Sequence, residues 1–135
     1  MIVIDSSAVV AMILGESGAQ PLAARLALEP RDSRLMSVVN YVEAGTVLAG
    51  RHRNPPQGIA DLDAFLHDFE IALAPADETI ARVAMEARVK FGKGFGHAGR
   101  LNFGDCFAYA LAKTHNAPLL YTGDDFRMTD VVSAI

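Results

Sequence analysis

The chain has 135 residues, of which 51% are hydrophobic and 21% are charged, as is typical of one folded domain with a substantial core. Its single cysteine excludes an internal disulfide, so nothing demands an oxidising compartment and a cytoplasmic location is expected. The net charge of −4 has the wrong sign for a simple nucleic-acid-binding protein, and no apolar run reaches the roughly 18 residues that a membrane span needs.

The first half of the chain alternates short apolar runs with helical patterns. The β-branched run 2–4 predicts a buried strand, and residues 6–14 predict a helix that Gly15 closes. Three further elements are expected in this order: a helix over 18–30, a strand over 34–38 and a helix over 38–53. The Asn-Pro-Pro run at 54–56 should end the last of these helices, because a proline ring cannot continue the backbone hydrogen-bond ladder.

The second half continues the alternation. Helices are expected over 59–69 and 78–91 and within 100–113, and strands are expected over 70–75 and 118–122. Asp77 is expected to cap the helix that begins at residue 78. A glycine-rich loop is expected at 92–99 and a turn at 123–126. Strands that alternate with helices predict a parallel sheet covered on both faces, so the sequence favours one α/β domain over residues 1–135.

Acidic residues fall at or near the expected carboxyl ends of several strands. Asp5 directly follows the first strand, and Asp124 and Asp125 follow the last. Glu43 lies within about two turns of the start of the helix after the second strand, and Asp105 lies in the first turn of the helix before the last strand. Because ligands of open parallel sheets bind at this edge, the five acids are candidates for one site.

Most of these acids also have a purely structural interpretation. Asp5 is suited to cap the helix that follows it, and Asp105 is suited to pair with an Asn102 cap in a helix first turn. The acids at 124–125 fit an ordinary turn. Glu43 is harder to explain in this way, because its neighbours at helical spacing are apolar and an unpaired carboxylate is costly there.

Converging carboxylates repel one another and therefore need cations nearby. Mg²⁺ and Mn²⁺ suit such a site, since hard cations prefer carboxylate oxygen and water as ligands. A divalent ion held in this way suits phosphoryl chemistry, because it lowers the pKa of bound water and stabilises a leaving oxyanion. Without the five candidate acids, the remaining 11 acidic residues nearly balance the 12 basic ones, so the excess negative charge is local to the site.

Four stretches in order resemble the successive motifs of PIN-domain ribonucleases, and more narrowly those of VapC toxins from bacterial toxin–antitoxin pairs. They are MIVIDSSAVVAMIL, NYVEAGTVL, RLNFGDCFAYALAK and PLLYTGDDFRMTDV. The resemblance covers essentially the whole chain and implies a three-layer α/β/α fold with a mainly parallel sheet. It implies a Mg²⁺- or Mn²⁺-dependent endoribonuclease in which water attacks the scissile phosphate, leaving 5′-phosphate and 3′-hydroxyl ends. It also implies a homodimer, a structured RNA substrate, and a VapB-like antitoxin whose C-terminal segment covers the active-site groove.

The resemblance assigns roles to individual residues. It implies that the core catalytic and metal-binding acids are Asp5, Glu43 and Asp105. The fourth acid is Asp124 by a Thr-x-Asp match, with Asp125 as the alternative, because relatives often carry the acid one position later. Ser6 belongs to the same motif as Asp5 and is expected to hydrogen-bond metal-bound water or the acids.

A basic segment leads into Asp105. Residues 87–104 contain no acid but carry Arg88, Lys90, Lys93 and Arg100. We expect these side chains to contact RNA phosphates, since an acidic site cannot attract a polyanion by itself. The alternatives are a solvated helix end or a surface that serves the antitoxin alone. In the same segment, Phe95 is a candidate for stacking on a base, and His97 is either a phosphate contact or a plain loop residue.

Other interpretations fit the sequence less well. A receiver-like domain would need paired acids after the first strand, and a haloacid-dehalogenase-type phosphatase would need Asp-x-Asp, whereas Asp5 is followed by two serines. A PIN-like binding module without catalytic activity remains the main alternative. Cys106 lies beside a candidate ligand but has no partnering histidine close in sequence, so we interpret it as a packing residue.

Overall fold

The computed structural model describes residues 1–96 and 98–135, in which four strands form one parallel sheet in the order β3-β2-β1-β4. His97, and with it the predicted choice between a phosphate contact and a loop residue, lies outside the described residues. The strands are β1 Ile2–Ile4, β2 Arg34–Ser37, β3 Ala72–Ala74 and β4 Leu119–Leu120. β1 lies inside the sheet, where Val3 pairs with Leu35 on one side and Leu119 on the other.

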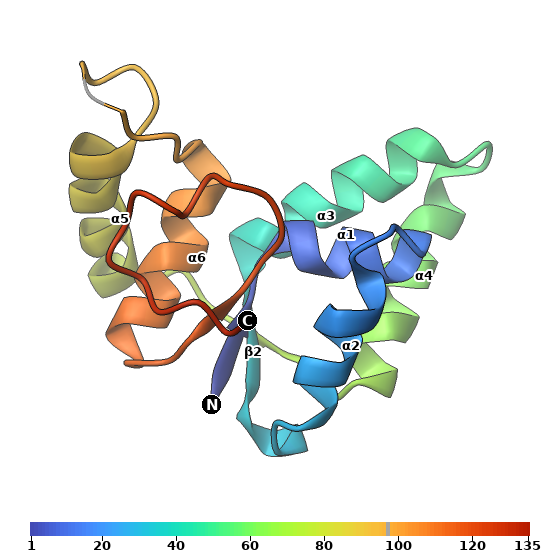
Figure 1. Ribbon diagram of the computed structural model, residues 1–135. Coiled ribbons are helices and arrows are strands. Elements are labelled where there is room, and N and C mark those ends of the chain that lie inside the picture. Colours follow the sequence, from blue (N-terminus) through green and yellow to red (C-terminus); the bar gives the residue numbers. More distant parts are fainter. Residues whose placement is uncertain (97) are drawn as a thin grey trace.

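Helices cover both faces of this sheet (Figure 1). One face carries α5 Glu78–Phe91 and α6 Phe103–Thr114. The other face carries α1 Ser6–Leu14, α2 Ala19–Ala27, α3 Val38–Arg51 and α4 Pro55–Asp68. A short 3-10 helix, η1 Arg31–Ser33, leads into β2. The predicted α/β/α layering is therefore confirmed, and among the described residues every strand pair is parallel.

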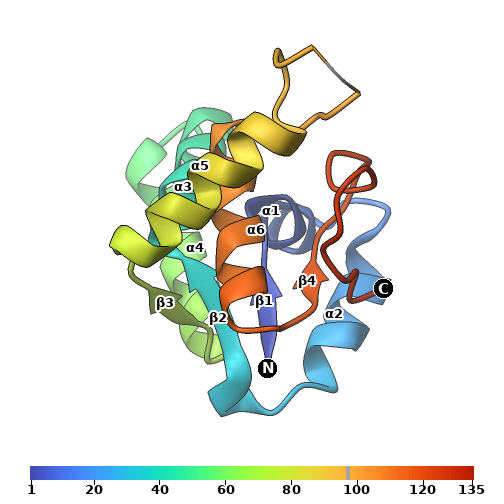
Figure 2. The same cartoon turned by 90° about the vertical axis from the view of Figure 1, so that its left-hand side faces the viewer.

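The alternation of side chains along β1 divides the core into two clusters. Val3 packs on the α5–α6 side, whereas Ile2 and Ile4 pack on the opposite side, and all three side chains are fully buried. Figure 2, viewed from the side of α5 and α6, shows these two helices in front of the strands. The sheet is thus held between two apolar layers, which fixes the edge where its strands end.

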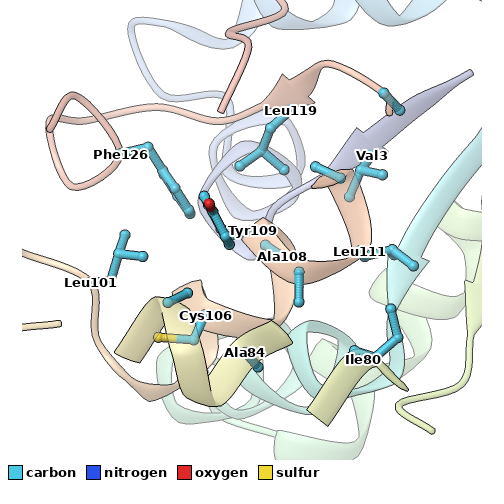
Figure 3. Packing of buried hydrophobic residues seen from close by; sticks show 14 of the residues in the cluster. Val3, Ile80, Ala84, Leu101, Cys106, Ala108, Tyr109, Leu111, Leu119 and Phe126 are labelled. Carbon is cyan, nitrogen blue, oxygen red and sulfur yellow. The ribbon is translucent and has the colours of Figure 1, made fainter. Parts of the chain in front are cut away.

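Cys106 belongs to the α5–α6 cluster, as predicted for a packing residue (Figure 3). Its Sγ donates a weak hydrogen bond to the Asn102 carbonyl oxygen at 3.2 Å. Burial raises the pKa of the thiol to about 11, so the reactive thiolate is disfavoured at neutral pH.

The structure differs from the sequence prediction mainly at element boundaries. α4 begins at Pro55 rather than at residue 59, because the two prolines that end α3 also occupy the first turn of the next helix. Gly58 lets the two helices approach closely, since a Cβ atom there would lie 2.5 Å from the Leu48 carbonyl oxygen. β4 is shorter than the predicted strand at 118–122.

The segment after β4 returns to the edge of the sheet. The Leu119 amide donates to the Val132 carbonyl oxygen at 2.8 Å, and the Ala134 amide donates to the Leu119 carbonyl oxygen at 2.9 Å. These bonds pair the outer edge of β4 with the chain itself. No helix among residues 1–96 and 98–135 is long and apolar enough to cross a membrane.

Candidate active site

The segments that follow β1 and β4 meet α3 and the start of α6 at a cleft of about 340 Å³ whose walls carry most of the predicted acids. The acidic residues that line it are Asp5, Glu16, Glu43, Asp105 and Asp125. Three hydroxyl residues lie among them, namely Ser6, Ser7 and Thr122. Glu16 was not predicted from the sequence, because it follows the end of α1 rather than a strand.

Asp5 is both a helix cap and a cleft residue. Its Oδ2 begins α1 by accepting hydrogen bonds from the Ser7 amide at 2.9 Å and from Ser7 Oγ at 2.6 Å. Its backbone amide donates to the Leu120 carbonyl oxygen at 2.9 Å, which ties it to the end of β4. Its Oδ1 is buried and has no hydrogen-bond partner among the described residues. Burial is the main reason that the pKa of Asp5 rises to about 6.

Asp105 combines the same two roles at the start of α6. Its Oδ2 accepts from the Asn102 amide at 2.9 Å, and its own amide donates to Asn102 Oδ1 at 2.8 Å, which completes a capping box. Burial raises the pKa of Asp105 to about 7 against the lowering effect of this bond, and the charges of Asp5, Asp125 and Glu43 add to the rise. Asp105 therefore stabilises the start of α6 and also lines the cleft, so its structural and functional interpretations are compatible.

Glu43 enters the cleft from α3, which follows β2 without a loop because Ser37 caps it directly. Ser6 Oγ donates a hydrogen bond to Glu43 Oε1, so the predicted auxiliary residue contacts an acid. Asn40 Nδ2 approaches the same oxygen at 3.4 Å. A Cβ atom on Gly104 would collide with the Glu43 carboxylate, so this acid lies directly against the first turn of α6.

The two adjacent acids after β4 have different surroundings. Asp125 lines the cleft, and its charge contributes to the raised pKa of Asp105. Asp124 does not line the cleft, and its Oδ1 pairs with Arg127 Nε at 2.9 Å. The structure thus brings Asp125, rather than the Asp124 that the Thr-x-Asp match favours, to the other carboxylates.

Asp125→Asn is expected to weaken Mn²⁺ binding by roughly tenfold, whereas Asp124→Asn is expected to change it little, because only the first substitution removes charge from the cleft. Isothermal titration calorimetry on both variants measures this ranking. If Asp124→Asn weakened Mn²⁺ binding more than Asp125→Asn, Asp124 would be the fourth acid of the site. If neither variant changed Mn²⁺ affinity, the two aspartates would only form a turn.

The predicted RNA-binding residues divide into two groups. Arg88 Nη1 donates to the carbonyl oxygens of Lys93 and Leu101 at 3.1 Å each, and the Arg88 guanidinium lies 5.3 Å from the centre of the Phe95 ring. Arg88 therefore joins the backbone at Lys93 to that at Leu101, and the face of the Phe95 ring already has a cationic partner. Lys90 in turn lies over its neighbouring Phe91 ring, 5.1 Å from the ring centre.

Arg100 and Lys93 are exposed members of the set. The Arg100 side chain is 64% exposed and its Nε lies 3.6 Å from Asp125 Oδ1, which places a guanidinium at the rim of the cleft. Lys93 is exposed on the loop that precedes it. An exposed ion pair of this length contributes little stability, so Arg100 can turn to another anion at small cost.

The donor set of the cleft fits a divalent cation, although no group of three or more acidic, histidine or cysteine side chains is arranged to hold a metal ion in the part of the chain that the structure describes. Asp5 Oδ1 is an orphaned buried acceptor, and Asp105 is surrounded by three other carboxylates that raise its pKa. Both features are relieved when a hard cation binds carboxylate oxygen. Asp5, Asp105, Glu43 and Asp125 are the residues able to hold one.

Relatives of the chain are found along nearly its whole length. The model of the PIN domain family matches residues 2–132. Ribonuclease VapC42 of Mycobacterium tuberculosis is 43% identical over 129 residues, which cover 96% of this chain and 95% of the relative.

Two solved structures share the fold. M. tuberculosis VapC20, a sarcin–ricin loop cleaving toxin, has a TM-score of 0.77 at 18% identity, with 98% of this chain and 97% of that chain covered. VapBC-1 from nontypeable Haemophilus influenzae has a TM-score of 0.74 at 20% identity, with 98% and 96% covered.

Proposed function

Because the chain belongs to the PIN-domain family, we propose that it is the ribonuclease toxin of a VapBC-like toxin–antitoxin pair, an endoribonuclease that hydrolyses RNA phosphodiester bonds. The observation that carries this proposal is the convergence of four carboxylates on one cleft at the carboxyl edge of the sheet. They are Asp5, Glu43, Asp105 and Asp125. In this proposal residues 1–135 act as one PIN domain, and the protein works in the cytoplasm, where its substrate is.

In this proposal some residues of the cleft bind the cation, and others orient its ligands or attract the RNA phosphate. Asp5 and Asp105 would hold Mg²⁺ or Mn²⁺ with the oxygens that their capping bonds leave available, and Glu43 and Asp125 would complete the charge. When bound, such an ion lowers the pKa of water and neutralises charge on a scissile phosphate. Ser6 fixes the Glu43 carboxylate, and Arg100 supplies the positive charge at the rim that an approaching phosphate needs.

The proposed activity is tested by incubating the full-length protein with a structured RNA. We expect cleavage in Mg²⁺ or Mn²⁺, complete loss in EDTA, and recovery when the metal is restored, with 5′-phosphate and 3′-hydroxyl ends on the products. Cleavage that resists EDTA would contradict the metal dependence. A folded protein that cleaves no RNA with either metal would instead be the catalytically inactive PIN-like binding module.

Lys93→Ala combined with Arg100→Ala is expected to weaken RNA binding broadly and to lower its salt slope by about one unit for each phosphate that the variant no longer neutralises. Cleavage positions should change little, because site choice depends on RNA shape and loop contacts. RNA affinity measured against salt concentration tests this. Arg82→Ala is the matched control, since this arginine of α5 pairs with Glu78 one turn away. If the plots of RNA affinity against salt concentration were the same for wild type and double variant, the two residues would not contact RNA.

An antitoxin partner is part of the same proposal, and VapBC-1 from H. influenzae supports it as a related complex. The acidic cleft suits an antitoxin arginine, because a guanidinium can occupy the place of the cation between carboxylates. Beyond the cleft, an apolar groove between α1, α2 and α4 suits an amphipathic segment. Phe65 and Phe69 stack at 4.5 Å between ring centres in its wall, while Asp61 and Asp68 line it as acids.

A homodimer is also proposed, and the surface near the start of α6 supports it. Phe103 is 69% exposed, and Val42 on α3 and Met85 on α5 are each 64% exposed. Phe103 lines apolar grooves with both helices, so these side chains belong to one surface. Apolar side chains gathered in this way favour contact with another protein surface.

A further inference from the structure

Asn40 is a buried polar residue that the fold alone does not explain. It lies in the first turn of α3 and is fully buried. Its Nδ2 donates to the Gly104 carbonyl oxygen at 3.0 Å and approaches Glu43 Oε1 at 3.4 Å. Its Oδ1 is buried without a hydrogen-bond partner among the described residues. A buried unpaired acceptor is destabilising, so an apolar residue of similar size would serve packing as well or better.

The orientation of this amide follows from what surrounds it. Its two contacts, the Gly104 carbonyl oxygen and the Glu43 carboxylate, are both acceptors. Only the NH₂ end can face them, and the opposite orientation would set oxygen against oxygen. The Asn40 NH₂ group therefore donates to two acceptors at the cleft, while the Asn40 Oδ1 is left without a hydrogen bond among the described residues.

Asn40 joins the two helices that supply Glu43 and Asp105. Glu43 lies about one turn further along α3, and Gly104 directly precedes Asp105 in α6. Because Gly104 has no side chain, the Glu43 carboxylate can lie against the first turn of α6. Ser6 holds the same carboxylate from the side of Asp5. The contacts of Asn40 and Ser6 thus connect Glu43 to both of the other core acids.

We propose that Asn40 is a positioning residue, whose amide fixes the Glu43 carboxylate and the first turn of α6 so that Glu43 and Asp105 face the cleft together. The inference rests on the proposed function, because it assigns Asn40 a role in the cation-binding cleft. Partners that hold a metal-binding carboxylate in this way typically change metal affinity 10- to 100-fold when they are removed.

The experiment measures Mn²⁺ affinity by calorimetry on the full-length, EDTA-treated protein, independently of RNA cleavage. Asn40→Ala is expected to weaken Mn²⁺ binding at least tenfold. Asn40→Leu should do the same, and it keeps the site filled if the smaller side chain prevents folding. Leu48→Ala is the matched control on α3, because it removes a buried core side chain outside the cleft and should leave Mn²⁺ affinity within twofold of wild type.

A double-variant cycle then distinguishes positioning from a general disturbance. Because Asn40 acts through Glu43 as well as through the first turn of α6, Asn40→Ala should weaken Mn²⁺ binding by a clearly smaller factor in the Glu43→Gln protein than in wild type. Independent, multiplying effects would overturn the inference, as would an Asn40→Leu protein that binds Mn²⁺ like wild type. Wild-type protein that neither binds Mn²⁺ nor cleaves RNA would reject the proposed function itself, and this inference with it.

Discussion

Asp105→Asn is expected to abolish RNA cleavage and toxicity, with activity at least about a hundredfold below wild type, while the metal-free protein becomes more stable. The activity falls because the substitution removes a charge from the carboxylates that we propose to hold the cation, a larger change than the removal of a supporting hydrogen bond. The stability rises because a neutral amide removes a buried charge, whose burial is the main reason that the Asp105 pKa rises to about 7, and with it the repulsion by Asp5, Asp125 and Glu43. The amide oxygen can still accept the capping hydrogen bond from Asn102.

Cleavage assays and chemical denaturation in EDTA measure the two effects on the same protein. Asp32→Asn is the matched control, because this exposed aspartate lies in the short 3-10 helix before β2 and outside the cleft. It should retain activity and stability close to wild type. An Asp105→Asn protein that still cleaves RNA would contradict the assignment of the site.

The metal-free protein is expected to lose stability as the pH rises from about 4 to about 7. Asp5 and Asp105 have pKa values of about 6 and about 7 in the folded chain, against 3.8 for an ordinary aspartate. In this window the folded chain retains protons that the unfolded chain has released, so ionisation favours the unfolded state. The stability contributed by the two protonated carboxyl groups is present below pH 4 and lost above pH 7, and the loss amounts to several kcal/mol.

Urea denaturation in EDTA at a series of pH values measures this loss. The Asp5→Asn, Asp105→Asn double variant should lack the descending limb, since it has no carboxyl group at either position. Adding Mn²⁺ at pH 8 should restore stability to the wild type, because a ligand of the folded state shifts the unfolding equilibrium. Parallel pH curves for wild type and double variant would show that ionisation of Asp5 and Asp105 does not cause the loss of stability.

The sequence was most informative where local chemistry determines structure. Asp77 followed by an apolar helical pattern predicted α5 with its observed bounds, and the Asp77 carboxylate accepts from the Ile80 amide at 2.9 Å. The prolines at 55 and 56 predict only the end of a helix, because a proline signal does not reveal that the next helix starts on the same residues.

The site was predictable to the extent that the sheet topology determines it. Asp5 could be placed at this edge because it directly follows a strand, and Asp105 because the start of the helix that leads into β4 can face the same edge. Asp124 and Asp125 could not be separated, since the choice depends on how the turn after Gly123 directs each side chain and on where Arg127 and Arg100 lie.

Asn40 and Gly104 were not found from the sequence. A buried asparagine in a helix has no local signature that separates it from an exposed one, and its contacts lie far along the chain. Gly104 offered a weak signal, because glycine inside a helical pattern often has a packing reason. Its actual reason, the Glu43 carboxylate, becomes visible only when α3 and α6 are brought together.

Asp5 and Asp105 each stabilise the start of a helix and also line the cleft. This double role limits which substitutions can inactivate a descendant of this chain without destabilising its fold. Alanine or valine would remove the N-cap of α1 at Asp5, at a cost of about 1 kcal/mol, or the second hydrogen bond of the α6 capping box at Asp105, in each case together with the charge. Asparagine and serine remove the charge but still accept the capping hydrogen bond. Inactive descendants that keep the fold should therefore carry these small polar residues at both positions, a substitution pattern that separates binding modules from nucleases.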